Sequence, residues 1–107
     1  MANTTLEKRR TITITGLDAD WDSNASAVHG NMKIKSFAFY PSAANDRMII
    51  RNKMIGGEVI FDSGLAVADT TPSIEYQNPP EWFEPFIDIS ECTLDTAANC
   101  KVIIKYV

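Results

Sequence analysis

Oxygen-bearing side chains recur at every second position of the segment "DADWDSN", in the order Asp18, Asp20, Asp22 and Asn24. This is the one-three-five-seven spacing by which a calcium-binding loop directs oxygen ligands toward the ion. The rest of that loop is missing, because Ser23 stands where a glycine makes the sharp turn and His29 stands where a bidentate glutamate closes the cage. We therefore expect these side chains to solvate a turn, and the sequence predicts neither a bound metal nor another cofactor.

The residues that could support hydrolytic catalysis are few and scattered. His29 is the only histidine, and its immediate neighbours supply neither the nucleophile nor the orienting carboxylate of a catalytic triad. A glycosidase needs two carboxylates that face each other across a cleft. Asp62, Asp88 and Glu91 instead lie on strand-like segments whose exposed faces carry acids routinely. The sequence thus predicts that the protein is not an enzyme.

Two cysteines, Cys92 and Cys100, flank the segment "TLDTAAN". If a hairpin were centred near Thr96, the two residues would lie opposite each other at a separation that suits a disulfide. The cytosolic start expected for this chain favours free thiols instead. Both states remain open, whereas zinc is disfavoured because two cysteines and one distant histidine do not supply four ligands.

Two short segments are candidates for contact with a partner. The basic run Lys8, Arg9 and Arg10 could be a solvated tail or could hold the preceding segment against an acidic surface, and it is too short for a nucleic-acid footprint. The segment "NPPEWFEPF" holds Trp82 and Phe83 between prolines, and an aromatic on a stiff loop can anchor a protein or stack on a sugar. We expect one of these aromatics to plug an end of the domain and the other to lie in an interface.

Composition indicates a single soluble globular domain. The chain has 107 residues, of which 45% are hydrophobic and 22% charged, and a chain of this size buries roughly two-thirds of its unfolded surface. Its net charge of −4 argues against nucleic acid as a partner. No run approaches the ~18 apolar residues of a membrane-spanning helix, and "MANTTLEKRR" lacks the apolar stretch of a secretory signal. We therefore expect synthesis in a cytosol and no membrane partner.

Alternation of apolar and polar residues predicts strands. In "RTITITG", Ile12 and Ile14 share one face. In "NMKIKSFAFY" the phase reverses, because the apolar residues are first Met32 and Ile34 and then Phe37 and Phe39. A one-residue slip exchanges the two faces of a strand. Either a bulge lies near Ser36, or the second half of the strand is buried on both sides.

Further strand-like runs are "RMIIRN", "EVIFD", residues 73–76, "PFIDISEC" and "CKVIIKYV", and no segment shows ten residues of helical periodicity. We expect a three-stranded meander over residues 32–62 and a closing hairpin over residues 85–107. The sequence predicts an N-terminal arm over residues 1–9. Residues 10–107 are predicted to form one all-β domain, a jelly-roll-like β-sandwich of about seven to eight antiparallel strands.

The succession "MKIKSFAFYPSAANDRMIIRN", "GEVIFD", "PPEWFEPFIDIS" and "CKVIIKYV" resembles small all-β virion structural proteins of tailed bacteriophages over about residues 10–107. The resemblance implies a capsid decoration (cement) protein that binds the outer head shell and braces neighbouring subunits of the major capsid protein. It also implies a homo-oligomer, with a trimer expected, and a place on the virion surface after synthesis in the host cytoplasm. It carries no site residue over to this chain.

Two alternatives stay open beside this interpretation. A tail or fibre-associated component would share the same strand pattern. A carbohydrate-binding module would need a planar array of aromatics on one face, and Trp21, Tyr76 and Trp82 are the residues that could form it.

Overall fold

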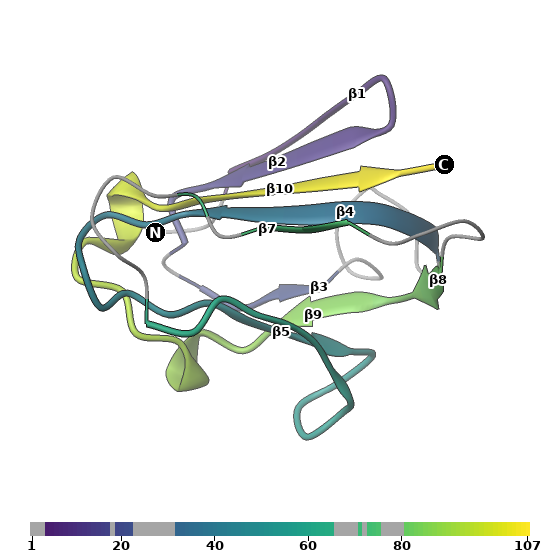
Figure 1. Cartoon of the computed structure of the whole chain (residues 1–107). Coiled ribbons are helices and arrows are strands. Elements are labelled where there is room, and N and C mark those ends of the chain that lie inside the picture. Colours follow the sequence, from purple (N-terminus) through teal and green to yellow (C-terminus); the bar gives the residue numbers. More distant parts are fainter. Residues whose placement is uncertain (1–3, 18, 23–31, 66–70, 72, 76–80) are drawn as a thin grey trace.

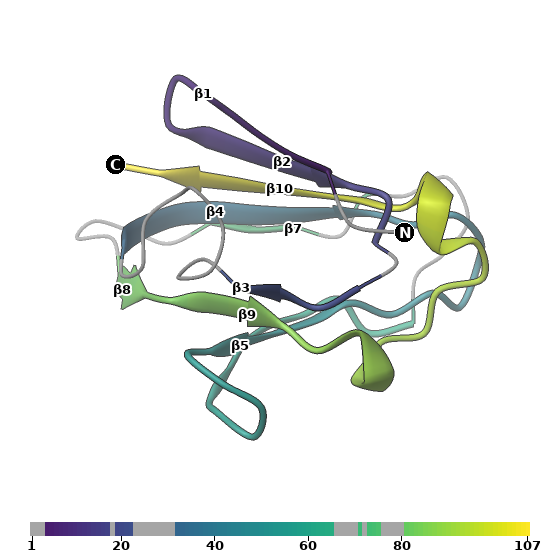
Figure 2. The ribbon, with the colours of Figure 1, turned by 180° about the vertical axis from the view of Figure 1, so that it is seen from behind.

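Two antiparallel β-sheets pack face to face in the computed structural model, which describes residues 4–17, 19–22, 32–65, 71, 73–75 and 81–107 (Figures 1 and 2). The six-stranded sheet has the order β1-β2-β10-β4-β7, with β8 also paired to β4, and the four-stranded sheet has the order β3-β9-β5-β6. The predicted all-β, single-domain sandwich is confirmed.

The strands are short and together make up most of the described chain. The six-stranded sheet contains β1 (Thr4–Lys8), β2 (Thr11–Thr15), β4 (Met32–Tyr40), β7 (Ser73–Glu75), β8 (Glu81–Phe83) and β10 (Lys101–Tyr106). The four-stranded sheet contains β3 (Trp21–Asp22), β5 (Ile49–Asn52), β6 (Val59–Asp62) and β9 (Pro85–Ile87). Two 3-10 helices, η1 (Ile89–Glu91) and η2 (Ala97–Asn99), lie between β9 and β10. Across the described segments, no helix has the length and apolar character needed to cross a membrane.

The strand order is that of a jelly roll. Apart from β1 and β8, the strands form the sets β2-β10-β4-β7 and β3-β9-β5-β6, one in each layer. Along the chain, these eight strands change layer at every connection except that from β5 to β6. Two such interleaved four-stranded sheets define the jelly roll, which encloses its core between layers without closing a barrel.

Two predicted connections are wrong. The expected meander over residues 32–62 is split, because β4 lies in one sheet and the β5–β6 hairpin lies in the other. The expected closing hairpin is also split, because β9 pairs with β3 and β5 whereas β10 pairs with β2 and β4. Alternation identifies which face of a strand is buried, but it does not identify the partner strand, since both layers bury their faces in the same core.

Most of the segment predicted to be an N-terminal arm is a strand of the six-stranded sheet. Residues Thr4–Lys8 form β1, which pairs with β2 along its whole length, from Thr4 opposite Thr15 to Lys8 opposite Thr11. A polar edge strand lacks the alternating apolar pattern because neither of its faces has to be fully buried. Leu6, for example, is 62% exposed.

The core lies between the sheets and is built from alternate residues of β2, β10 and each half of β4, together with consecutive residues of β5 and β6. Ile12 and Ile14 of β2 and Val102 and Ile104 of β10 are fully buried, as the alternation predicts. The aromatic rings of Phe37 in β4 and Phe61 in β6 meet across the two layers, with their centroids 5.8 Å apart.

A β-bulge in β4 explains the phase reversal of that strand. On β10, Lys105 lies opposite Ser36 and the next residue, Tyr106, lies opposite Ile34, so Lys35 is the extra residue. The bulge lets Ile34 and Phe37 both point into the core, where each is fully buried. Of the two explanations offered from the sequence, the bulge near Ser36 is therefore the correct one.

A buried carboxylate joins two of the connections between the layers. Asp46, which is 1% exposed, lies between β4 and β5. It accepts hydrogen bonds from the main-chain N–H of Ser42 (2.7 Å), from the Ser42 hydroxyl (2.6 Å) and from the main-chain N–H of Asp95 (2.9 Å). Burial raises the pKa of Asp46, but the hydrogen bonds from Ser42, Asp95 and Ala43 together outweigh burial and lower that pKa below 3.8.

Replacing Asp46 by asparagine should therefore destabilise the fold. Asparagine has the same shape, but its amide replaces one of the two acceptor oxygens by an NH2 group, which would face hydrogen-bond donors. We therefore expect a loss of about 2–3 kcal/mol in unfolding free energy at neutral pH. Because the folded-state pKa is lowered, the carboxylate stabilises the protein above its unfolded pKa, and this stability is lost as the pH falls through the folded pKa. Urea unfolding at several pH values measures both effects.

The matched control for this experiment is Asp95→Asn, since that side chain is exposed and only its main-chain N–H reaches Asp46. The control should unfold like the native protein at neutral pH. If the loss of unfolding free energy in Asp46→Asn stays the same far below pH 3.8, the charge of Asp46 is not what stabilises the connections between the layers.

Candidate functional site

The outer face of the six-stranded sheet carries small, hydroxylated and basic side chains. Because the buried residues of β2, β10 and the second half of β4 point inward, the intervening residues point away from the core. Strand register places these outward residues side by side in rows, one of which contains Leu6, Thr13, Ile103, Ala38 and Ser73.

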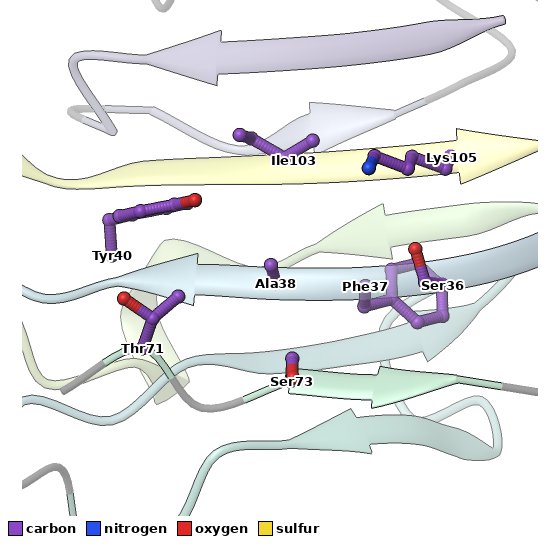
Figure 3. Close-up of a pocket in the computed structure, with 8 residues that line it drawn as sticks. All are labelled: Ser36, Phe37, Ala38, Tyr40, Thr71, Ser73, Ile103 and Lys105. Carbon is purple, nitrogen blue, oxygen red and sulfur yellow. The ribbon is translucent and has the colours of Figure 1, made fainter.

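A hollow of about 330 Å³ lies on this face, over β4 and between β10 and β7 (Figure 3). Ala38 lies at its centre, and its small side chain leaves room between the longer residues on either side (Figure 3). The lining residues are Ser36, Phe37, Ala38, Tyr40, Thr71, Ser73, Ile103 and Lys105. Four hydroxyl groups and one ammonium group therefore surround the hollow, and these groups can bind a neutral or negatively charged polar group by hydrogen bonds.

Cations are concentrated on the six-stranded sheet. Seven of the ten Lys and Arg residues lie on its strands or in its β1–β2 turn: Lys8, Arg9, Arg10, Lys33, Lys35, Lys101 and Lys105. Two of these stack on aromatic rings, because Lys101 Nζ lies 4.3 Å from the centroid of the Tyr40 ring and Lys33 Nζ lies 5.4 Å from that of Trp82. Such contacts orient the ammonium groups without neutralising them.

The other layer carries charges of both signs. Its two strand-associated arginines are paired, since Arg47 forms a bidentate contact with Asp62 at 2.9 and 2.5 Å and Arg51 Nε lies 2.9 Å from Glu91. The Arg47 guanidinium lowers the pKa of Asp62. Five of the described acids lie on or beside the four-stranded sheet, namely Glu58, Asp62, Glu84, Asp88 and Glu91. The net charge of −4 thus conceals an uneven distribution, because most of the cations lie on the six-stranded sheet.

The sequence did not single out this basic face, although its pattern contains the signal. In "KVIIKY", Lys101, Ile103 and Lys105 alternate with the two buried residues, and in "SFAFY" Ser36, Ala38 and Tyr40 do the same. Reading the outward positions of both strands together requires knowing that β10 and β4 are neighbours. That pairing is not visible in either segment alone.

The structure distinguishes the two aromatics that the sequence left equivalent. Trp82 is 57% exposed, whereas Phe83 packs against the hydrophobic core. Trp82 is therefore the one available for an interface, and its contact with a partner stays a prediction.

One of the three aromatic residues predicted to form a sugar-binding surface, Trp21, is buried. Trp21 is 4% exposed, and its indole N–H donates a hydrogen bond of 2.9 Å to the Thr5 hydroxyl. Tyr76 lies outside the described residues.

The basic run Lys8, Arg9 and Arg10 forms the end of β1 and the turn into β2. All three side chains are exposed. The turn was not predicted, because two arginines do not resemble the Asn-Gly pairs that usually mark such a turn.

The acidic "DADWDSN" pattern is only partly visible. Asp18, Asn24, the side chain of Asp22 and the loop residue His29 lie outside the described part of the chain. Asp20 is described, and its carboxylate accepts a hydrogen bond of 2.8 Å from the main-chain N–H of Ile89 at the start of η1. Within the described residues, no group of three or more His, Cys, Asp or Glu side chains could hold a metal ion.

The two cysteines are free thiols, so the structure favours the reduced alternative. Cys92 follows η1 and lies 3.7 Å from the Met48 sulfur, whereas Cys100 follows η2 and lies 3.6 Å from an Asp46 carboxylate oxygen. They do not lie opposite each other in a hairpin, because β9, which precedes Cys92, and β10, which follows Cys100, belong to different sheets. Burial raises the pKa of Cys92 from 9.0 to about 11.

Comparisons with protein-family models, with curated proteins and with solved structures returned no match. By its architecture the chain is an all-β jelly roll with a six-stranded layer and a four-stranded layer.

Burial of Cys92 should slow its reaction with thiol reagents. Because the reactive species is the thiolate, a pKa raised from 9.0 to about 11 should slow modification of Cys92 by on the order of a hundredfold relative to the unfolded chain. Thiol titration with a chromogenic disulfide, before and after urea, measures this ratio. Equal rates in both states, or fewer than two thiols in the unreduced unfolded protein, would contradict the arrangement.

Proposed function

We propose that this chain is a non-enzymatic structural protein of a tailed-phage virion, a capsid decoration protein that binds the outer head shell and braces neighbouring major capsid subunits. Two lines support the proposal. The first is the resemblance in strand succession described above. The second is the jelly-roll architecture, which viral capsid proteins use widely; this is an analogy at the level of the fold, which hosts other functions too.

The basic outer face of the six-stranded sheet is the observation that carries the proposal. A brace needs a broad, stiff contact surface, and this face is backed by the buried hydrophobic core of the sandwich. Its lysines are exposed or half-buried and are not engaged in the ion pairs that occupy Arg47 and Arg51 on the other layer. We infer that the contact surface on the shell is acidic, since complementary charge speeds encounter and orients the partners.

Oligomerisation would strengthen such attachment. A trimer on a local symmetry axis would present three copies of the basic face to the shell, and linked binding sites gain affinity through effective concentration. Trp82 and Lys33, at the β8 end of the same sheet, would extend the contact surface. The oligomeric state can be measured directly by light scattering.

The hydroxyl-lined hollow supports a second candidate, a carbohydrate-binding module. Hydroxyl groups and an ammonium group around a hollow can hydrogen-bond a sugar, and jelly rolls also occur in lectins. Replacing Ala38 by leucine would fill the hollow. A glycan array on which the native protein binds and Ala38→Leu does not would favour this candidate over the decoration protein.

The proposal predicts how charge reversal affects attachment to shells. We expect the double variant Lys101→Glu and Lys105→Glu to bind about tenfold more weakly to shells of the major capsid protein encoded in the same genome. Co-sedimentation measures the affinity, and attachment of the native protein should weaken as salt screens the charges.

Lys53→Glu, in the β5–β6 connection of the opposite layer, is the matched control for each single reversal, Lys101→Glu or Lys105→Glu, because all three variants replace one lysine by glutamate. It should bind shells like the native protein. Full-affinity binding by the double variant would exclude the basic face as the contact surface, and no binding by the native protein at low salt would overturn the proposed function itself.

A further inference from the structure

The turn between β1 and β2 has an unusual composition for its geometry. Lys8 pairs with Thr11, so Arg9 and Arg10 alone connect the two strands. Both have positive φ angles, 53° and 60°. Positive φ at both central positions is the signature of a type I′ turn, which strongly prefers Asn-Gly or Asp-Gly. Two arginines in this conformation carry backbone strain, because their Cβ atoms crowd the following carbonyl groups.

The surrounding sheet holds the strained turn in place. The hairpin pairs over five residues on each side, and the carbonyl of Arg10 accepts a hydrogen bond of 3.0 Å from the main-chain N–H of Tyr106. The conformation is therefore imposed by neighbouring strands and does not depend on the arginine side chains. Strain that persists at a position where a better residue is available points to a functional demand on the side chains.

The two arginines are also electrostatically available. Both are exposed, and no described acid lies within ion-pair distance of either guanidinium group. In both views the turn between the end of β1 and the start of β2 projects from the upper layer, clear of the rest of the ribbon (Figures 1 and 2). Lys8, also exposed, lies beside it.

We propose that the Arg9–Arg10 turn is an anchor that binds a carboxylate-rich patch on a partner protein, and that its arginines are retained for binding at the expense of fold stability. A guanidinium group binds a carboxylate through two parallel hydrogen bonds. Nucleic acid fits less well, because the turn itself offers only a few cations and the net charge of −4 opposes the approach of a phosphate backbone. The inference holds whether or not the partner is a capsid subunit.

The decisive variant is Arg9→Asn with Arg10→Gly, which restores the preferred turn sequence and removes both guanidinium groups. We expect its thermal unfolding midpoint to rise by about 4–8 °C, since relief of roughly one residue's strain has this effect in a domain of this size. With poly-L-glutamate as the probe at low salt, we expect its affinity to fall about tenfold. Titration calorimetry and thermal unfolding of the full chain measure the two effects.

Two further variants separate charge, strain and recognition. Lys53→Asn relaxes another non-glycine residue with positive φ, 77°, and also removes a cation, so it should raise the midpoint slightly while leaving poly-L-glutamate binding unchanged. Arg9→Lys with Arg10→Lys keeps the charge and the strain but removes the bidentate groups, so its affinity should fall between those of the native protein and the Asn-Gly variant.

Several outcomes would overturn the proposal. Unchanged poly-L-glutamate affinity in the Asn-Gly variant would remove the binding role of the turn, and an unchanged or lower unfolding midpoint would remove the cost in stability. An equal loss of poly-L-glutamate affinity in Lys53→Asn would show that net charge, and not the position of the arginines, determines binding. Tighter binding of the native protein to duplex DNA than to poly-L-glutamate, lost in the Asn-Gly variant, would assign the anchor to phosphate.

Discussion

The Asp46 carboxylate is the constraint on which the arrangement of the two layers depends. Hydrophobic burial drives the sheets together, but it is non-directional and does not specify which connections cross between them. Asp46 is specific, because it binds the turn after β4 and the segment before η2 at once, and a main-chain bridge between Arg47 and Thr93 continues the same junction. A buried carboxylate without these donors would be strongly unfavourable. The junction therefore favours the one arrangement that satisfies it.

The bulge at Lys35 links this fold to the candidate site. Before the bulge, Met32 and Ile34 point inward, and after it Phe37 and Phe39 do so. Without the extra residue the second half of β4 would turn over. Its phenylalanines would then face solvent, and Ser36 and Ala38 would face the core. One irregular residue thus completes the core and leaves the small, hydroxylated side chains of the hollow on the outer face.

Sequence reasoning succeeded where the information was local and failed where it was not. The alternation around Ile12 and Ile14 predicted β2, and the phase reversal predicted either a bulge or two-sided burial, of which the structure has the bulge. Each of these patterns lies within one strand. The pairing of β9 and β10 with different sheets could not be predicted, because it depends on contacts between segments far apart in the chain. The same limitation hid the basic face, whose residues come from β1, β2, β10 and β4. The turn at Arg9 was missed for a different reason, because its residues contradict the usual preference for that geometry.

The concentration of cations on the six-stranded layer restricts how copies of this protein could assemble. Two basic faces would repel each other, so symmetric dimers that bring these two faces together are disfavoured at low ionic strength. Copies that meet along their edges avoid this repulsion and keep all of their basic faces on one side. Such an assembly would present a single continuous basic surface. A brace that contacts several subunits of an acidic shell at once would use such a surface, so the charge distribution is compatible with the oligomer that we propose.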